Sequence, residues 1–372
     1  MAQQHLDPTD PAAGEVTGDA LAAYLRAQAT EFLRALRLHR ETGGHTAAGG
    51  AEESVDAARL LRRSARRISG SLHTFRPLLD ADWSEEMRQE LAWLSGTLGL
   101  EHAYEARLER LLLALHRLSG ATVLPAHAVD VVAAGSRAAG AAPAPLKAAL
   151  ENTGGPANVT ATAERGNLTV GAAKAGALLE RQLTLARTRA HSTALQALGS
   201  SRFHAVADKV AVLASEVPLA PAASTTDLRP PAAAAEERLT AAIAALPLVT
   251  AGHPYNAEAL VHGLSPDPAP HPQDGPWHQV RLLLRLHRYA QEALHGGNIP
   301  VDVRLLAAGR ALNRHRDASE AAAAAAQAAR TPRIAPATAY ALGVLHADQR
   351  HEVEAARFAF QQAWQKRTVG TP

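Results

Sequence analysis

The stretch that decides the fold is VDAARLLRRSARRISGSLHTFR, residues 55–76. Its apolar side chains recur every three or four residues, which is the spacing of a helix with one buried face. That face consists of Leu61, Ala65, Ile68, Leu72 and Phe75. The sequence therefore predicts an amphipathic helix here that stops before Pro77.

The composition of the whole chain also favours helix. The chain has 372 residues, of which 47% are hydrophobic and only 4% aromatic, so we expect a core built mainly from Ala, Leu and Val. Ala, Leu and Arg are good helix formers because little side-chain freedom is lost when they enter a helix. No run of alternating β-branched residues is long enough to predict a sheet. We predict an all-α protein.

Two groups of helices are expected. Residues 1–16 are predicted to be a disordered tail, and 17–215 an N-terminal bundle with an Ala-, Gly- and Pro-rich insertion at about 133–167, after which helix resumes near Thr169. Residues 216–235 are predicted to be a Pro-rich linker, and 236–372 a C-terminal bundle. Its helices are expected at about 277–295, 301–315, 317–330, 336–347 and 350–367.

Several classes of protein are excluded or disfavoured. The chain has no cysteine, so disulfides and thiolate metal sites are excluded. No apolar run reaches the length of a membrane span, and the first residues are too polar for a signal peptide. We therefore expect a cytoplasmic protein without a membrane partner. A metal site at His346, His351 and Glu352 is disfavoured, because a spacing of five does not place two histidines on one helix face.

The polar face of the helix at 55–76 is strongly basic. Arg59, Arg62 and Arg66 follow helical spacing, Arg67 lies beside them, and Asp56 is the one acid of the stretch. The net charge of the chain is only +2 with histidine neutral, so the position of the charges carries the signal rather than their sum.

A second basic stripe occurs in WHQVRLLLRLHRY, residues 277–289. The stripe consists of His278, Arg281, Arg285 and Arg288. The residues between them are mostly apolar, which should draw this helix deep into a bundle. Burying an unpaired charge costs on the order of several kcal/mol. Either distant carboxylates pair with these arginines, or the groove stays hydrated and receives an anion.

The two stripes and the segments around them resemble the CHAD family, whose name stands for conserved-histidine α-helical domain. The first family helix has the form His-x-x-Arg-x-x-x-Arg-Arg-x-Arg followed by Phe-Arg-Pro-Leu, and here Arg59, Arg62, Arg66 and Arg67 precede FRPLLD. The second helix is similar in His278, Arg281, Arg285, Arg288 and Tyr289. LNRHRDASEA, with His315, and YALGVLHADQ are similar to later family segments. The resemblance spans about 18–367.

The resemblance implies two pseudo-symmetric antiparallel four-helix bundles around a basic central cavity, without catalytic residues. It also implies binding of inorganic polyphosphate and association with polyphosphate granules. The residues expected to contact polyphosphate are Arg59, Arg62, Arg66, Arg67, His278, Arg281, Arg285, Arg288 and His315. No cofactor and no metal are expected.

The chain departs from the family pattern in ways that leave an alternative open. Arg59 replaces the first family histidine, and Ser69, Leu282 and Leu286 replace basic residues. A degenerate scaffold for protein–protein contacts is therefore the alternative function. Nucleic-acid binding is disfavoured because there is no recognition motif or basic tail and few aromatic residues. An enzyme is disfavoured because no paired carboxylates, nucleophile motif or Gly-rich phosphate loop is present.

Overall fold

The computed structural model describes residues 16–42, 48–120, 156–248, 250–253, 261, 263–264, 271–296 and 302–365. Regular structure in these ranges is helical, apart from one isolated antiparallel bridge between Leu79 and Leu219. The predicted all-α class is confirmed. The predicted tail at 1–16, except Val16, and the insertion at 133–155 lie outside the described residues.

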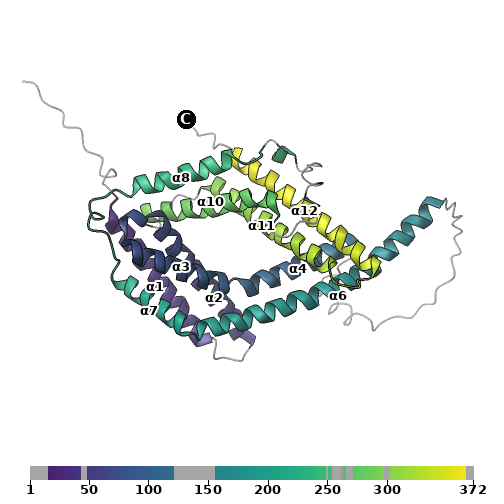
Figure 1. The fold of residues 1–372 in the computed structure, drawn as a ribbon, viewed down its shortest axis with the longest axis horizontal. Helices are drawn as coiled ribbons and strands as arrows, with labels where there is room; N and C mark the ends of the chain where they lie inside the picture. The colour runs from purple at the N-terminus through teal and green to yellow at the C-terminus, as the bar shows by residue number, and fades with distance from the viewer. Residues whose placement is uncertain are drawn as a thin grey trace, which may run out of the picture.

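The helices carry the labels of Figure 1. They are α1 (Gly18–Thr42), α2 (Ala48–Thr74), α3 (Ala81–Thr97), α4 (Leu100–Ser119), α6 (Pro156–Leu198), α7 (Ser201–Ser215), α8 (Arg229–Ala244), α10 (Gly275–Leu294), α11 (Val303–Ala329) and α12 (Pro336–Gln365). Short 3₁₀ turns are η2 (Arg76–Leu78), η4 (Thr250–Gly252) and η5 (Pro272–Asp274).

Side-chain caps fix where several helices begin. The Asp80 carboxylate accepts from the Trp83 amide before α3, and the Ser200 hydroxyl accepts from the Phe203 amide before α7. Asp302 caps α11 by accepting from two backbone amides. Such caps stabilise a helix by about 1 kcal/mol each, because they satisfy amides that have no partner within the helix.

Three predicted helix boundaries were wrong. The segments at 301–315 and 317–330 form one helix, α11, and those at 336–347 and 350–367 form one helix, α12, which ends at Gln365. No Pro or Gly interrupts either junction, so nothing in the backbone breaks the helix there. Helix α6 begins at Pro156, earlier than the predicted start near Thr169.

The hydrophobic core consists of three clusters. The first joins α1, α2, α3 and α7 around Phe32, Ile68 and Phe203. The second joins α4 and α6 to α11 and α12, and the third joins α8, α10, α11 and α12 around Trp277 and Phe360. Packing therefore crosses the predicted boundary between the two halves. The domain limits and the pseudo-symmetry of two bundles stay predictions.

The predicted linker at 216–235 packs against the first cluster. The Asp80 amide donates to Pro218 O (3.0 Å), and the Gly18 amide donates to Ala223 O (3.0 Å). Position 18 needs glycine because a Cβ there would lie 2.5 Å from Ala223 O. The last residues of this segment already belong to α8, which begins at Arg229 with two prolines in its first turn.

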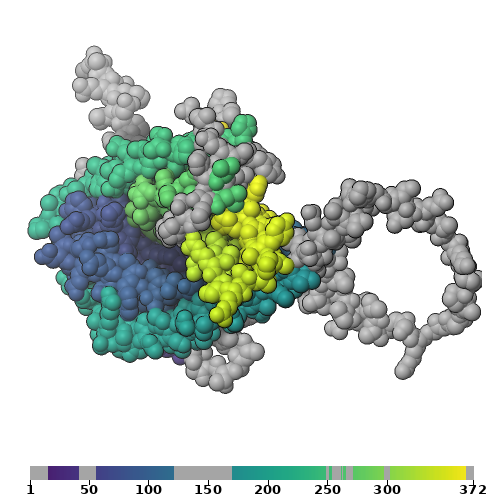
Figure 2. Space-filling model, turned by 45° about the vertical axis from the view of Figure 1, so that its right-hand side comes forward, coloured from purple at the N-terminus to yellow at the C-terminus, as the bar shows by residue number. Residues whose placement is uncertain are grey.

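The helices are arranged so that α2 and α10 meet. Figure 1 shows α1, α2, α3 and α7 together at one end, while α4 and α6 run from that end toward α11 and α12. Figure 2 shows the surface hollowed between the blue helices of the N-terminal half and the green and yellow helices of the C-terminal half. None of the described helices is long and apolar enough to cross a membrane.

Candidate functional site

Helix α2 contributes two half-buried arginines to the site. The Arg62 Nε donates to the backbone oxygen of Ser95 on α3 (3.2 Å). Arg66, one turn further along the same face, makes no hydrogen bond or ion pair with the described residues. The opposite face of α2, with Leu61 and Ile68, is buried in the first core cluster and fixes the direction of both arginines.

Helix α10 contributes Arg281 and Arg285. The Arg281 Nε donates to Asn313 Oδ1 on α11 (2.8 Å), whereas Arg285 makes no hydrogen bond or ion pair in the described part of the chain. Both side chains are half-buried because Trp277 and Leu284 on the same helix are fully packed in the third core cluster. Tyr289 packs tightly on α2, where a Cβ at Gly70 would lie 2.6 Å from its ring.

Helix α11 contributes Arg316, which we did not predict as a site residue. Its guanidinium group bonds to Asp317 and lies 3.9 Å from the Glu320 carboxylate. The residue stands beside His315 in the LNRHRDASEA segment, so the family resemblance held a signal for it. The spacing of the two basic stripes did not, because α11 lies outside both.

The five guanidinium groups affect one another. Burial lowers the pKa of Arg66 to about 10, with further lowering by Arg62 and Arg285. Burial, followed by repulsion from Arg316 and Arg285, lowers the pKa of Arg281 to about 9. The pKa values of Arg62 and Arg285 are lowered in the same way, by burial first and by Arg316. Three separate helices therefore bring their positive charges into one place.

We name this group the arginine cluster; its members are Arg62, Arg66, Arg281, Arg285 and Arg316. Two carboxylates act on it, Asp317 and Glu320, both from α11. The cluster is therefore unevenly neutralised: Asp317 and Glu320 act on Arg62, Arg281 and Arg316, whereas the described part of the chain gives Arg66 and Arg285 no acidic partner.

Three other predicted site residues lie outside the cluster and have acidic partners. Arg67 donates twice to Glu292 on α10 (2.6 and 3.1 Å), and the same carboxylate accepts from the Tyr24 hydroxyl of α1 (3.1 Å). Arg288 lies 3.6 Å from Glu292. Arg59 is exposed, pairs with Asp56 (3.1 Å) and lies 3.4 Å from His102 Nδ1.

The two predicted histidines occupy different environments. His278 is half-buried beside the cluster, and burial lowers the pKa of its ring. His315 is only 1% exposed, and burial lowers the pKa of its ring to about 4. The two rings meet edge to face, 5.5 Å apart. His278 is thus placed near the arginines, whereas His315 belongs to the protein interior.

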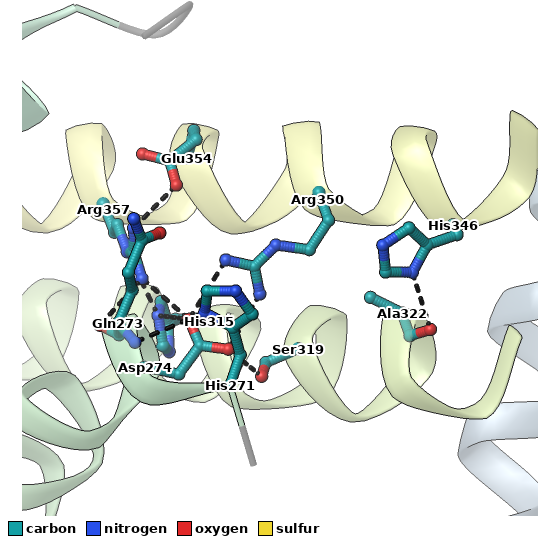
Figure 3. A network of polar contacts seen from close by, with 10 residues as sticks. All are labelled: His271, Gln273, Asp274, His315, Ser319, Ala322, His346, Arg350, Glu354 and Arg357. Carbon is teal, nitrogen blue, oxygen red and sulfur yellow. Dashed lines mark hydrogen bonds and ion pairs between the residues drawn. The ribbon is translucent and has the colours of Figure 1, made fainter. Parts of the chain in front are cut away.

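His315 is part of a buried network around Asp274, which Figure 3 shows in detail. Asp274 is fully buried and accepts from Arg350 (2.8 Å), Arg357 (2.7 Å) and Ser319 (2.5 Å). The His315 Nε2 lies 3.4 Å from the same carboxylate. Burial opposes ionisation of Asp274, but hydrogen bonds from His315 and Arg350 outweigh it and hold the pKa of this carboxyl well below its usual range.

The network positions the site although it does not face it. Asp274 immediately precedes α10, while Arg350 and Arg357 belong to α12 and His315 and Ser319 to α11. One carboxylate therefore holds the start of α10 against two other helices. Because Arg281 and Arg285 lie on α10, this contact helps to fix their position. The spacing of residues in the sequence does not predict this network, because Arg350 and Arg357 lie 76 and 83 residues from Asp274. Within the described ranges, no group of three or more His, Asp or Glu is placed to hold a metal.

The class of protein follows from the comparisons with known families. The CHAD domain model matches residues 27–298, which is most of the chain, so the protein belongs to the CHAD family. The resemblance found in the sequence is confirmed.

One solved structure is similar over nearly the whole chain. It is PptA from Streptomyces chartreusis, with 68% sequence identity and a TM-score of 0.72; the match covers 94% of this chain and 99% of that one. No curated protein sequence matches.

Proposed function

We propose that this protein binds inorganic polyphosphate, without catalysing a reaction on it, through the arginine cluster. The observation that carries the proposal is that five partly buried guanidinium groups from three helices lie together while only two carboxylates of the described residues act on them. Arg66 and Arg285 have no acidic partner among the residues that the structure describes. A group of like charges held together in this way is unfavourable until an anion joins it.

A linear polyphosphate fits this arrangement for chemical reasons. It carries about one negative charge per phosphoryl unit along a flexible chain, so one molecule can reach several arginines at once. A guanidinium group donates two parallel hydrogen bonds to non-bridging oxygens, and such charge-assisted bonds are among the stronger ones in proteins. Burial, and after it repulsion from other arginines, lowers the pKa values of Arg66 and Arg281, and a bound phosphate would offset this repulsion.

Family membership supports the same ligand, because CHAD domains are known to bind polyphosphate. The site would consist of Arg62, Arg66, Arg281, Arg285 and Arg316, with His278 at its edge. Arg59, Arg67 and Arg288 would contribute mainly through their long-range charge, because each lies against a carboxylate. We place the protein in the cytoplasm, in association with polyphosphate granules.

The proposal is tested with two double variants of equal charge. Arg66→Gln/Arg285→Gln removes the two arginines that have no acidic partner. Arg63→Gln/Arg314→Gln removes two exposed arginines without an ion pair among the described residues. Titration with long-chain polyphosphate at moderate salt should show a loss of affinity of about 30-fold or more in the first variant only.

Duplex DNA and a protein-binding role are the competing outcomes. Polyphosphate should displace DNA in a competition assay, because the sequence has no nucleic-acid recognition motif or basic tail and few aromatic residues for stacking on bases. Equal affinity of both double variants and the wild type would reject the site. Absence of polyanion binding by the wild type at low salt would favour the scaffold alternative.

A further inference from the structure

Glu320 is one of the two carboxylates that act on the arginine cluster. It lies on α11 one turn after Arg316, whose Nε is 3.9 Å from Glu320 Oε1. Its charge also acts on Arg62 and on His278. A single acidic side chain therefore faces cations from α2, α10 and α11.

The same carboxylate holds an arginine from a fourth helix. The Arg107 Nη2 on α4 donates to Glu320 Oε2 (2.6 Å). Arg107 is well enclosed, with 17% of its side chain exposed, and its guanidinium group lies 5.3 Å from the Tyr104 ring centre. Its Nε is buried without a hydrogen-bond partner. Glu320 is the ion-pair partner that the described part of the chain gives to Arg107.

We propose that Glu320 occupies an anion position between Arg107 and Arg316 in the free protein, and that a phosphoryl group of the bound chain takes this position over. Arg107 then becomes a sixth binding arginine, and Glu320 a determinant of affinity and of chain-length preference. This inference rests on the proposed function of the arginine cluster.

The physical argument is an exchange of anions. In this position the Glu320 carboxylate already pairs with Arg107 and, at a longer distance, with Arg316. A phosphoryl group that enters the position must therefore displace that carboxylate. Arg66 and Arg285 face no such competitor among the described residues. A short phosphate chain would bind these two arginines without displacing a carboxylate, whereas a long chain would be held there and could reach Arg107 as well. Displacing Glu320 therefore costs binding free energy, and only a long phosphate chain, through its further contacts with the cluster, can compensate for that cost.

The chain offers a matched control. Glu352 on α12 has the same charge as Glu320 and a similar exposed fraction of its side chain, 43% against 41%. It also pairs with arginines of α4, Arg110 at 3.7 Å and Arg117 at 3.8 Å, and neither of these belongs to the arginine cluster. A change of net charge alone would affect both variants equally.

The experiment measures the affinity for long-chain polyphosphate at several salt concentrations. The proteins are the wild type, Glu320→Gln, Glu352→Gln and Arg107→Gln/Glu320→Gln. We expect Glu320→Gln to raise the affinity about fivefold and to steepen the salt dependence by about one released counterion, because Arg107 is set free. Glu352→Gln should match the wild type. The double variant should lose most of the gain.

The outcomes separate this inference from the proposed function. If the wild type binds polyphosphate and Glu320→Gln has the same affinity, the exchange at Glu320 is overturned. The same holds if Glu352→Gln raises the affinity as much as Glu320→Gln does. Both results leave the arginine cluster as the site. A gain that survives in the double variant overturns the role of Arg107. A wild type that binds no polyphosphate overturns both. Melting curves of all four proteins verify that each is folded.

Discussion

The guanidinium group of Arg62 lies directly against Gly99, at the junction of α3 and α4. A Cβ at position 99 would overlap that group, although the backbone there (φ −91°) is open to any residue. Because Gly99 has no side chain, the Arg62 guanidinium group has the space that it needs to donate to Ser95 O. A residue without a side chain thus helps to position a cation of the arginine cluster.

Gly99→Ala should weaken polyphosphate binding while leaving the fold intact. The added methyl group displaces the flexible end of Arg62, which costs little folding energy but moves one positive charge. We expect the affinity to fall by about two- to fivefold in a titration at moderate salt. Gly96→Ala on α3 is the control, because a Cβ there meets nothing within 4 Å. Equal affinity of the two variants would contradict the positioning role.

Asp274→Asn should strongly destabilise the protein. The amide cannot neutralise Arg350 and Arg357, which are 2% and 4% exposed and would keep buried charges without their shared partner. We expect the free energy of unfolding, measured with urea, to fall by about 3–5 kcal/mol. Asp82→Asn, at an exposed position in the first turn of α3, should change it by less than about 0.5 kcal/mol. A small effect at Asp274 would mean that the network does not hold α10 in place.

Stability should decrease when the pH is lowered from 7 to 4. Burial lowers the pKa of His315 to about 4 from an ordinary value of 6.5, so the unfolded chain binds the proton more readily than the folded one. The stabilising contribution is complete above about pH 6.5 and is lost as the pH falls toward 4, on the order of 3 kcal/mol. The lowered pKa of His287, also caused by burial, acts in the same direction.

Urea unfolding at pH 7, 6 and 5 measures this effect. His315→Gln should flatten the pH dependence even if it lowers stability at every pH. An unchanged slope in this variant would assign the effect to other groups. Asp274 contributes in a separate window below its ordinary pKa, because its own pKa is lowered and its stabilisation is lost only in stronger acid.

Glu292→Gln should separate a structural role from a binding role at Arg67. The Glu292 carboxylate joins α1, α2 and α10 through Tyr24 and Arg67, so its removal leaves a partly buried arginine without an anionic partner. We expect a loss of about 1–3 kcal/mol in unfolding free energy. Polyphosphate affinity should stay the same or rise slightly. A large loss of affinity in a folded variant would place Arg67 in the binding site after all.

The sequence predicted which helix faces carry the basic residues. Spacing by three and four residues indicates which helix face an arginine occupies, and the structure brings Arg62, Arg66, Arg281 and Arg285 together. Arg67 follows Arg66 directly but is turned by about 100° on the helix. Its partner Glu292 lies 225 residues away, and no local pattern predicts that contact.

The remaining differences have the same origin in tertiary packing. In α12, the polar residues Gln349 and Arg350 are buried and bond to partners on other segments, so a stretch that looked like a break is part of the protein interior. The all-α class was predictable from composition and apolar spacing. The contribution of Arg316 to the arginine cluster was not predictable from helical spacing, because it depends on how α4, α6, α11 and α12 pack together.

The salt dependence of polyphosphate binding tests the central claim most directly. We predict that the logarithm of the binding constant of the wild type falls steeply and linearly with the logarithm of salt concentration, and that Arg66→Gln/Arg285→Gln reduces this slope by about two counterions. Arg63→Gln/Arg314→Gln should leave it unchanged. A slope that is the same in all three proteins would contradict binding at the arginine cluster.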